Sequence, residues 1–162
     1  MAFHYMFRVS HTCQVLLVED DSDDAFLFMR AASLTCPNMV IAVAGDPLEA
    51  RKTLQLAATP TESVSLIVSD LKMPRVNGIE FISWIRSQPE FESVPVILLS
   101  SSSEMRDVRD AYAAGASLYM VKPAGGDDYK TLLEQIGNFW INGTAPTDKT
   151  FLIPKPRAHG VN

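Results

Sequence analysis

The sequence has little cysteine, no long apolar run and no excess of basic residues, and each absence excludes a class of protein. Its 162 residues include two cysteines, Cys13 and Cys36, whose spacing is not that of metal ligands. Free thiols are typical of a chain in the reducing cytoplasm, so we expect neither a disulfide framework nor a secreted fold. No apolar run approaches the ~20 residues that a membrane helix requires. The net charge of −5 provides no basic field that would favour nucleic acid.

What is present is the composition of an ordinary folded domain. Hydrophobic residues make up 47% of the chain and charged residues 20%, and this length can bury a sizeable core in one domain. The first residues, MAFHYMFRVSH, lack the apolar core and cleavage site of a signal peptide. We therefore expect a cytoplasmic protein with an N-terminal extension (1–12), one domain (13–141) and a C-terminal tail (142–162).

Short apolar segments alternate five times with segments of helical periodicity. The apolar segments lie at 15–18, 39–43, 66–68, 96–99 and 118–121. Continuous apolar strands joined by helical crossovers predict a parallel sheet that is buried on both faces, with helices on either side. Four residues are predicted to cap the helices, namely Ser22, Asp46, Asn77 and Ser101, the last with Glu104 in capping-box spacing.

Polar residues stand at the carboxyl ends of four of these strands. Glu19 and Asp20 follow the first, Asp70 follows the third, Ser100 ends the fourth and Lys122 follows the fifth. Each has an ordinary alternative reading: a helix cap or loop acid, a serine before a helix, a surface lysine. In open α/β sheets, however, ligands bind at this edge, where the ends of parallel strands meet. Five such positions together favour a single site.

The chemistry of this set points to phosphoryl transfer. Three carboxylates close together repel one another and raise one another's pKa, and a divalent cation such as Mg²⁺ relieves that repulsion. A lysine and a hydroxyl at the same point supply a cation and a donor for phosphoryl oxygens. An acid nucleophile, a metal, a lysine and a hydroxyl together predict a site that works through an aspartyl phosphate.

Four segments, VLLVEDD, SLIVSDLKMPRVNG, PVILLSS and GASLYMVKP, closely resemble the receiver domains of two-component response regulators. The resemblance covers about residues 14–140. It implies a flavodoxin-like (βα)5 fold with the strand order 2-1-3-4-5, and it implies that Asp70 is the phospho-acceptor.

Further roles follow from the same resemblance. Glu19 and Asp20 match the acidic pair that holds Mg²⁺ with Asp70 and the backbone carbonyl of Lys72. Glu19 stands where an aspartate is commoner and is expected to reach the ion through water. Lys122 matches the lysine that pairs with the phosphoryl group. Two further positions match the switch, Ser100 as its hydroxyl and Tyr119 as the aromatic that turns inward on phosphorylation. Ordinary strand packing is the alternative for Tyr119. Lys72 and Ser102 lie where the family tunes dephosphorylation.

The implied function is a phosphorylation switch and not an enzyme in the usual sense. A histidine kinase donates the phosphoryl group, and the fourth helix, fifth strand and fifth helix present an output surface to an unknown protein partner. A helix-turn-helix domain would need ~60 further residues on the usual domain scale, and the tail offers none, so we expect no nucleic-acid partner and no membrane partner. The chain is similar to the small stand-alone receivers paired with bacterial phytochrome kinases.

Two alternatives remain open. In a haloacid-dehalogenase-like phosphatase, Asp21-Ser22-Asp23 would supply the nucleophile on the first strand, although the chain is short for that fold and lacks its cap domain. In a receiver-shaped scaffold, no residue would be phosphorylated at all.

The C-terminal tail is predicted to be extended or disordered because it has three prolines and few apolar residues. One apolar patch, Phe151 to Ile153, interrupts it. Together with Tyr129, Phe139 and Trp140, this patch suggests more apolar surface than a tail needs, and on that ground we predict a homodimer.

Overall fold

The structure, a computed structural model, describes residues 13–56, 64–143 and 145–157, and the expected extension 1–12 lies outside this part. Six strands form one sheet in the order β2-β1-β3-β4-β5-β6. They are β1 (Cys13–Val18), β2 (Met39–Ala44), β3 (Leu66–Ser69), β4 (Val96–Ser100), β5 (Leu118–Val121) and β6 (Leu152–Ile153). The first five are parallel and confirm the order 2-1-3-4-5. The sixth, antiparallel to β5, is not predicted by the sequence.

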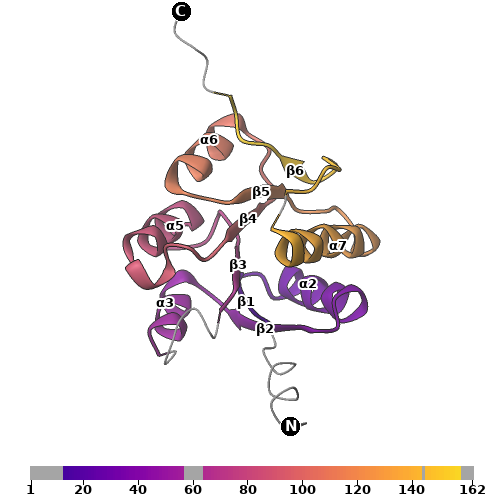
Figure 1. The fold of residues 1–162 in the computed structure, drawn as a ribbon, viewed down its shortest axis with the longest axis horizontal. Helices are drawn as coiled ribbons and strands as arrows, with labels where there is room; N and C mark the ends of the chain where they lie inside the picture. The colour runs from indigo at the N-terminus through magenta and orange to yellow at the C-terminus, as the bar shows by residue number, and fades with distance from the viewer. Residues whose placement is uncertain (1–12, 57–63, 144, 158–162) are drawn as a thin grey trace, which may run out of the picture.

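Helices cover both faces of this sheet. They are α2 (Ser22–Thr35), α3 (Pro47–Leu56), α5 (Gly78–Ser87), α6 (Met105–Ala114) and α7 (Gly126–Asn142), with a short 3-10 helix η1 (Pro89–Phe91). Figure 1 shows α3, α5 and α6 on one side of the sheet and α2 and α7 on the other. Within the described ranges no helix combines the length and the apolar character that crossing a bilayer would take.

The central strands β3 and β4 are buried along their whole length. Successive side chains alternate between the two faces, so Ile67 and Leu98 belong to the core under α3, α5 and α6, whereas Val68 and Ile97 belong to the core under α2 and α7. Burying each such side chain contributes about 1.5–3 kcal/mol. This two-sided burial fixes the strands, and with them the positions of the residues at their ends.

The cap of α2 is Asp21, and the prediction of Ser22 is wrong. The Asp21 carboxylate accepts hydrogen bonds from the backbone N–H groups of Asp23 and Asp24 at 2.8 and 3.1 Å, and Ser22 is already the first helical residue. A carboxylate at this position both satisfies free N–H groups and opposes the helix dipole.

Of the three other predicted caps, two are confirmed and one is wrong. Asp46 and Asn77 are confirmed, because each side chain accepts the backbone N–H three residues further on at 2.9 Å. The predicted capping box at Ser101 is wrong. The neighbouring Ser102 hydroxyl accepts the N–H of Glu104 at 3.3 Å instead, so the loop before α6 is held by the next serine along.

The C-terminal segment packs against the domain through the extended strand β6. Of the prediction that this tail is extended or disordered, the disordered alternative is wrong in this part. Phe151 and Leu152 are buried in the core under α7, and the Val121 N–H donates to the Phe151 carbonyl at 2.8 Å. Tyr129 is also buried. The apolar surface on which the homodimer was predicted is therefore largely the chain's own core, and the homodimer stays a prediction without that support.

Candidate functional site

Backbone hydrogen bonds beyond the strand ends hold three of the predicted site residues in place. The N–H of Glu19 donates to the carbonyl of the last residue of β2 at 3.0 Å. The N–H of Asp70 donates to the carbonyl of the last residue of β1 at 2.9 Å, and the N–H of Lys122 donates to the carbonyl of the last residue of β4 at 2.8 Å. The sheet register therefore continues by one residue into the site, and all three side chains start from one edge.

The three predicted acids converge at this edge. Glu19, Asp20 and Asp70 each offer a carboxylate oxygen, and these oxygens lie within 4.8 Å of one another. The Asp70 side chain is 11% exposed, Glu19 is buried and Asp20 is exposed. The cluster is thus closed on the protein side and open to solvent beside Asp20.

Lys122 reaches the same point from β5. Its ammonium lies 2.7 Å from Glu19 Oε2, 2.7 Å from Asp24 Oδ2 and 3.4 Å from Asp70 Oδ2. Asp24 is a member that the sequence reasoning missed, because it was assigned only to the first turn of the helix. Helical side chains lean toward the helix N-terminus, so an acid four residues after Asp20 could have been placed near the end of β1.

Burial in the site raises the pKa values of two of its acids. Burial raises the pKa of Asp70 and the charge of Asp20 adds to this, although Lys122 and a backbone hydrogen bond act the other way. Burial also raises the pKa of Glu19 in spite of its bond to Lys122. Burial acts to lower the pKa of Lys122, but its bonds to Asp24 and Glu19 and the charge of Asp70 outweigh it and raise the pKa.

The negative charges of the site outnumber its one positive charge, which favours the binding of a cation. Lys122 pairs with Glu19, Asp24 and Asp70, and the acidic cluster of Glu19, Asp20 and Asp70 adds a carboxylate that no lysine pairs in the described part of the chain. All their ligand atoms are oxygens, which hard divalent ions prefer. The residues present therefore fit a divalent metal at the open, Asp20 side of the cluster.

The loop after β3 fixes the Asp70 carboxylate. The Leu71 N–H donates to Asp70 Oδ1 at 2.7 Å, which leaves Oδ2 toward Lys122. The Gly78 N–H donates to the Leu71 carbonyl at 2.8 Å, and a Cβ on Gly78 would lie 2.2 Å from the Asp70 carbonyl oxygen. The start of α5 can approach Asp70 this closely only with glycine. The sequence indicated a turn at Asn77-Gly78 but not this role.

The two predicted switch residues meet below the site. Ser100 is buried, and its hydroxyl accepts the Ser102 N–H at 3.1 Å. Tyr119 lies inward and fully buried, and its hydroxyl donates to the Ser102 carbonyl at 2.8 Å. Burial raises the pKa of Tyr119, while hydrogen bonds to Ser100 and Ser102 act against this. The Ser102 hydroxyl in turn donates to Asp107 at 2.6 Å, which links the loop to α6.

A second tyrosine connects this region to the C-terminal strand. The Tyr112 hydroxyl on α6 accepts the Tyr119 N–H at 3.1 Å and donates to the Ile153 carbonyl at 2.7 Å. The sequence reasoning placed Tyr112 only on the apolar face of its helix. Because the partner Ile153 is 41 residues away, no local pattern could indicate this bridge.

Residues 15–134 match the model of the response regulator receiver domain family. The probable methanogenesis regulatory protein FilR2 of Methanothrix harundinacea is 31% identical over 128 residues, which cover 78% of this chain and 83% of that protein. Response regulator Rcp1 of Synechocystis is 27% identical over 129 residues, which cover 78% and 88%.

Solved structures agree with these relatives. The phosphorylated cyanobacterial phytochrome response regulator RcpA matches with a TM-score of 0.72 and 25% identity, covering 84% of this chain and 99% of that one. The Mn²⁺-bound form of Rcp1 matches with a TM-score of 0.70 and 27% identity, covering 83% and 99%.

The phosphatase alternative finds no support, because its nucleophile would be Asp21, whose carboxylate caps α2. The central strand order, the convergent acids and lysine, and a family match over most of the chain agree. The chain therefore belongs to the response regulator receiver family.

Proposed function

We propose that this chain is a stand-alone response regulator of a two-component phosphorelay, which accepts a phosphoryl group from a histidine kinase on Asp70 and then switches a protein-binding surface. The observation that carries the proposal is the Asp70 carboxylate itself. It stands at a strand end with Oδ1 held by the Leu71 N–H, with Lys122 3.4 Å from Oδ2 and with two further acids within 4.8 Å.

In the proposed reaction, Asp70 Oδ2 attacks the phosphorus of a kinase phosphohistidine in line. The P–N bond breaks, its electron pair stays with the imidazole, and a P–O bond to Asp70 forms. Lys122 neutralises charge on the transferred group. Asp20, Asp70 and the Lys72 carbonyl would hold Mg²⁺ directly and Glu19 through water, and the bound ion supplies further positive charge. The Mn²⁺-bound form of the relative Rcp1 supports a divalent ion here.

Phosphorylation adds charge and acceptor oxygens that Ser100 can bind. The Ser100 hydroxyl accepts the Ser102 N–H and keeps its own O–H to donate to a phosphoryl oxygen. A movement of Ser100 toward that oxygen would draw Ser102 with it, and the Ser102 carbonyl is the partner of the inward Tyr119. A shift of this loop is thereby passed to Tyr119, and through Tyr112 to α6 and β6. The expected output surface needs one correction, since β6 covers the outer edge of β5. A downstream protein would meet α6, α7 and β6.

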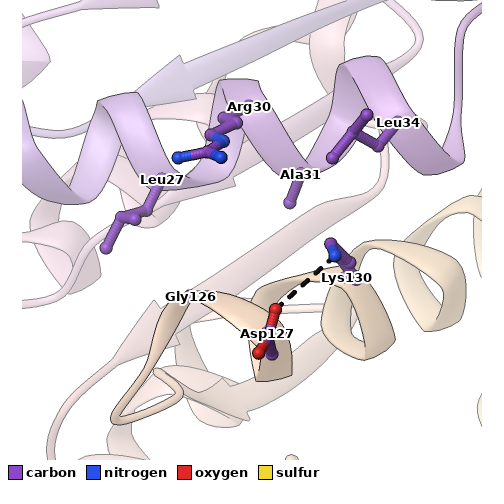
Figure 2. Close-up of a pocket in the computed structure, with 7 residues that line it drawn as sticks. All are labelled: Leu27, Arg30, Ala31, Leu34, Gly126, Asp127 and Lys130. Atoms are coloured by element: carbon purple, nitrogen blue, oxygen red, sulfur yellow. Dashed lines mark hydrogen bonds and ion pairs between the residues drawn. The ribbon is translucent and has the colours of Figure 1, made fainter.

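The kinase must contact the side of the molecule from which Asp70 is reached. A hollow lies between α2, which also carries Asp24, and α7, which begins four residues after Lys122. It is lined by Leu27, Arg30, Ala31, Leu34, Gly126, Asp127 and Lys130. Figure 2 shows the α2 side chains facing Asp127 and Lys130 of α7 across it. Phe26 on the same helix is 61% exposed. We assign this surface to the kinase. The description of RcpA as a phytochrome response regulator supports a phytochrome-type kinase as the partner.

A kinase-independent experiment tests the proposal. Incubation with acetyl phosphate and Mg²⁺ should add one phosphoryl group to the wild type, visible by intact mass, and none to Asp70→Asn. The group should then be lost by the chain's own hydrolysis. Asp21→Asn is the control and should still be phosphorylated. An unmodified wild type would favour the scaffold alternative, and modification of Asp21 would favour the phosphatase.

The remaining parts of the proposal concern the setting. A cytoplasmic location follows from the phosphohistidine donor, because such kinases present it inside the cell. A homodimer is retained only as an outcome to measure, by light scattering with and without a phosphoryl mimic.

A further inference from the structure

The Lys122 ammonium has three N–H donors, and three carboxylates lie within 4 Å of it. Glu19 Oε2 and Asp24 Oδ2 lie at 2.7 Å, which is a short, charge-assisted hydrogen-bond distance. Asp70 Oδ2 lies further away, at 3.4 Å. Two donors are therefore engaged by Glu19 and Asp24, and the ammonium forms an ion pair with the proposed nucleophile.

The two engaged partners are held by different parts of the fold. Glu19 follows β1 and is buried, with its other oxygen accepting the Asp21 N–H at 3.0 Å. Asp24 comes from the first turn of α2, and its side chain is 34% exposed. The Asp24 backbone N–H donates to the capping carboxylate of Asp21. The cap thus fixes the turn from which Asp24 reaches Lys122.

We propose that Asp24 is a positioning residue for phosphoryl transfer, which holds the Lys122 ammonium so that its free N–H points at the phosphoryl group on Asp70. The proposal rests on the proposed function of Asp70. Without Asp24, the lysine would keep only Glu19 as a fixed partner and could rotate about that bond. Lys122 supplies positive charge beside the transferred group, and Asp24 fixes the direction in which the Lys122 ammonium points.

The chain offers a matched control in the same turn. Asp23→Asn removes the same charge from the same turn of α2, and its side chain is exposed with no ion pair to Lys122 among the described residues. Asp24→Asn should lower the maximal rate of phosphorylation by acetyl phosphate about tenfold relative to Asp23→Asn, within the range that mispositioning costs. The apparent affinity for Mg²⁺ should stay the same in both variants. Asp24→Glu, which restores the carboxylate, should recover most of the rate.

A second readout needs neither metal nor phosphate. In ¹⁵N-lysine-labelled protein in EDTA, the Lys122 ammonium signal, assigned by its loss in Lys122→Arg, should be protected from exchange in wild type and Asp23→Asn but lost in Asp24→Asn. Equal rates and equal signals in the two Asn variants would overturn the proposal, and so would a faster Asp24→Asn. If the wild type itself is not phosphorylated, the proposed function fails, whereas the ammonium signal still tests the contact.

Discussion

Among single residues, Gly78 shows how closely the backbone limits the site. A methyl group on its Cα would lie 2.2 Å from the Asp70 carbonyl and 2.9 Å from Leu98 Cδ1. Moving either the backbone or a packed core residue costs free energy. We therefore expect Gly78→Ala to lower the free energy of unfolding by about 2–3 kcal/mol. It should also slow phosphorylation, because the clash falls on the residue that carries the nucleophile.

Urea denaturation of Gly78→Ala and of a matched glycine variant measures this effect. Gly126 begins α7, and a Cβ there would meet only Leu27 Cδ2 at 3.7 Å, an ordinary contact. Gly126→Ala should stay within about 0.5 kcal/mol of the wild type. Equal stability of the two variants would mean that the loop after β3 relaxes freely, and the close approach to Asp70 would then be unimportant.

Individual residues also show what sequence reasoning can reach. Glu19, Asp70 and Lys122 could be predicted because each stands at the end of an apolar strand, and parallel strands bring such ends together. Asp24 could have been placed near this edge from the lean of helical side chains, but its bond to Lys122 depends on where α2 begins and how its first turn lies over the sheet. The choice of Asp21 over Ser22 as the cap is of the same kind, since both residue types make good caps.

At the scale of elements, Tyr112 joins α6, β5 and β6 through one hydroxyl. Tyr112→Phe removes both hydrogen bonds and should cost about 1–2 kcal/mol of unfolding free energy. The loss should be local to β6, so the Val121 N–H, which donates to Phe151, should exchange faster with solvent. Amide exchange followed by NMR measures this directly.

Tyr129→Phe is the matched control, because no hydrogen bond of the Tyr129 hydroxyl is found among the described residues although the ring is buried. It should leave the exchange of Val121 unchanged. If Tyr112→Phe and Tyr129→Phe behave alike, β6 is held by the burial of Phe151 and Leu152 alone, and Tyr112 does not couple it to the switch.

Strands and helices that have their own apolar pattern in the sequence could be predicted, whereas β6, which forms through contacts with distant residues, could not. The five parallel strands have apolar runs and helices between them, so their order follows from the family resemblance. The strand β6 has two residues in a proline-bearing segment and exists only because Phe151 and Leu152 find a place beside α7. The apolar patch at Phe151 to Ile153 is the one local sign of it, and that patch alone does not show that the segment packs on its own domain.

For the whole molecule, the charges of the site should make stability depend on pH and on divalent ions together. Burial raises the pKa of Asp70 and Glu19 above their ordinary values of 3.8 and 4.5. The stability that these groups contribute is therefore complete below the ordinary values and is lost as pH rises through the raised ones. Lys122, whose pKa is raised above 10.5, stays charged throughout this window.

In EDTA, wild type should lose unfolding free energy relative to Asp70→Asn as pH rises from about 4 to about 8, because Asn carries no charge to bury. Asp46→Asn should show the opposite sign in a different window, below about pH 4, and little difference from the wild type above it. Hydrogen bonds from backbone N–H groups, chiefly that of Glu49, hold the pKa of Asp46 below 3.8, so that carboxylate stabilises above its ordinary pKa and the contribution is lost as pH falls.

A divalent ion bound at the site should restore the unfolding free energy that the wild type loses as pH rises. At a hundred times its dissociation constant, Mg²⁺ should add about 2.7 kcal/mol to the wild type near pH 8. It should add less near pH 4, where protons compete for the carboxylates, and less to Asp70→Asn. Urea denaturation across pH, with and without the ion, gives all of these values. Equal stabilisation of wild type and Asp70→Asn would place the ion elsewhere, because only a site that includes the Asp70 carboxylate links its binding to this titration.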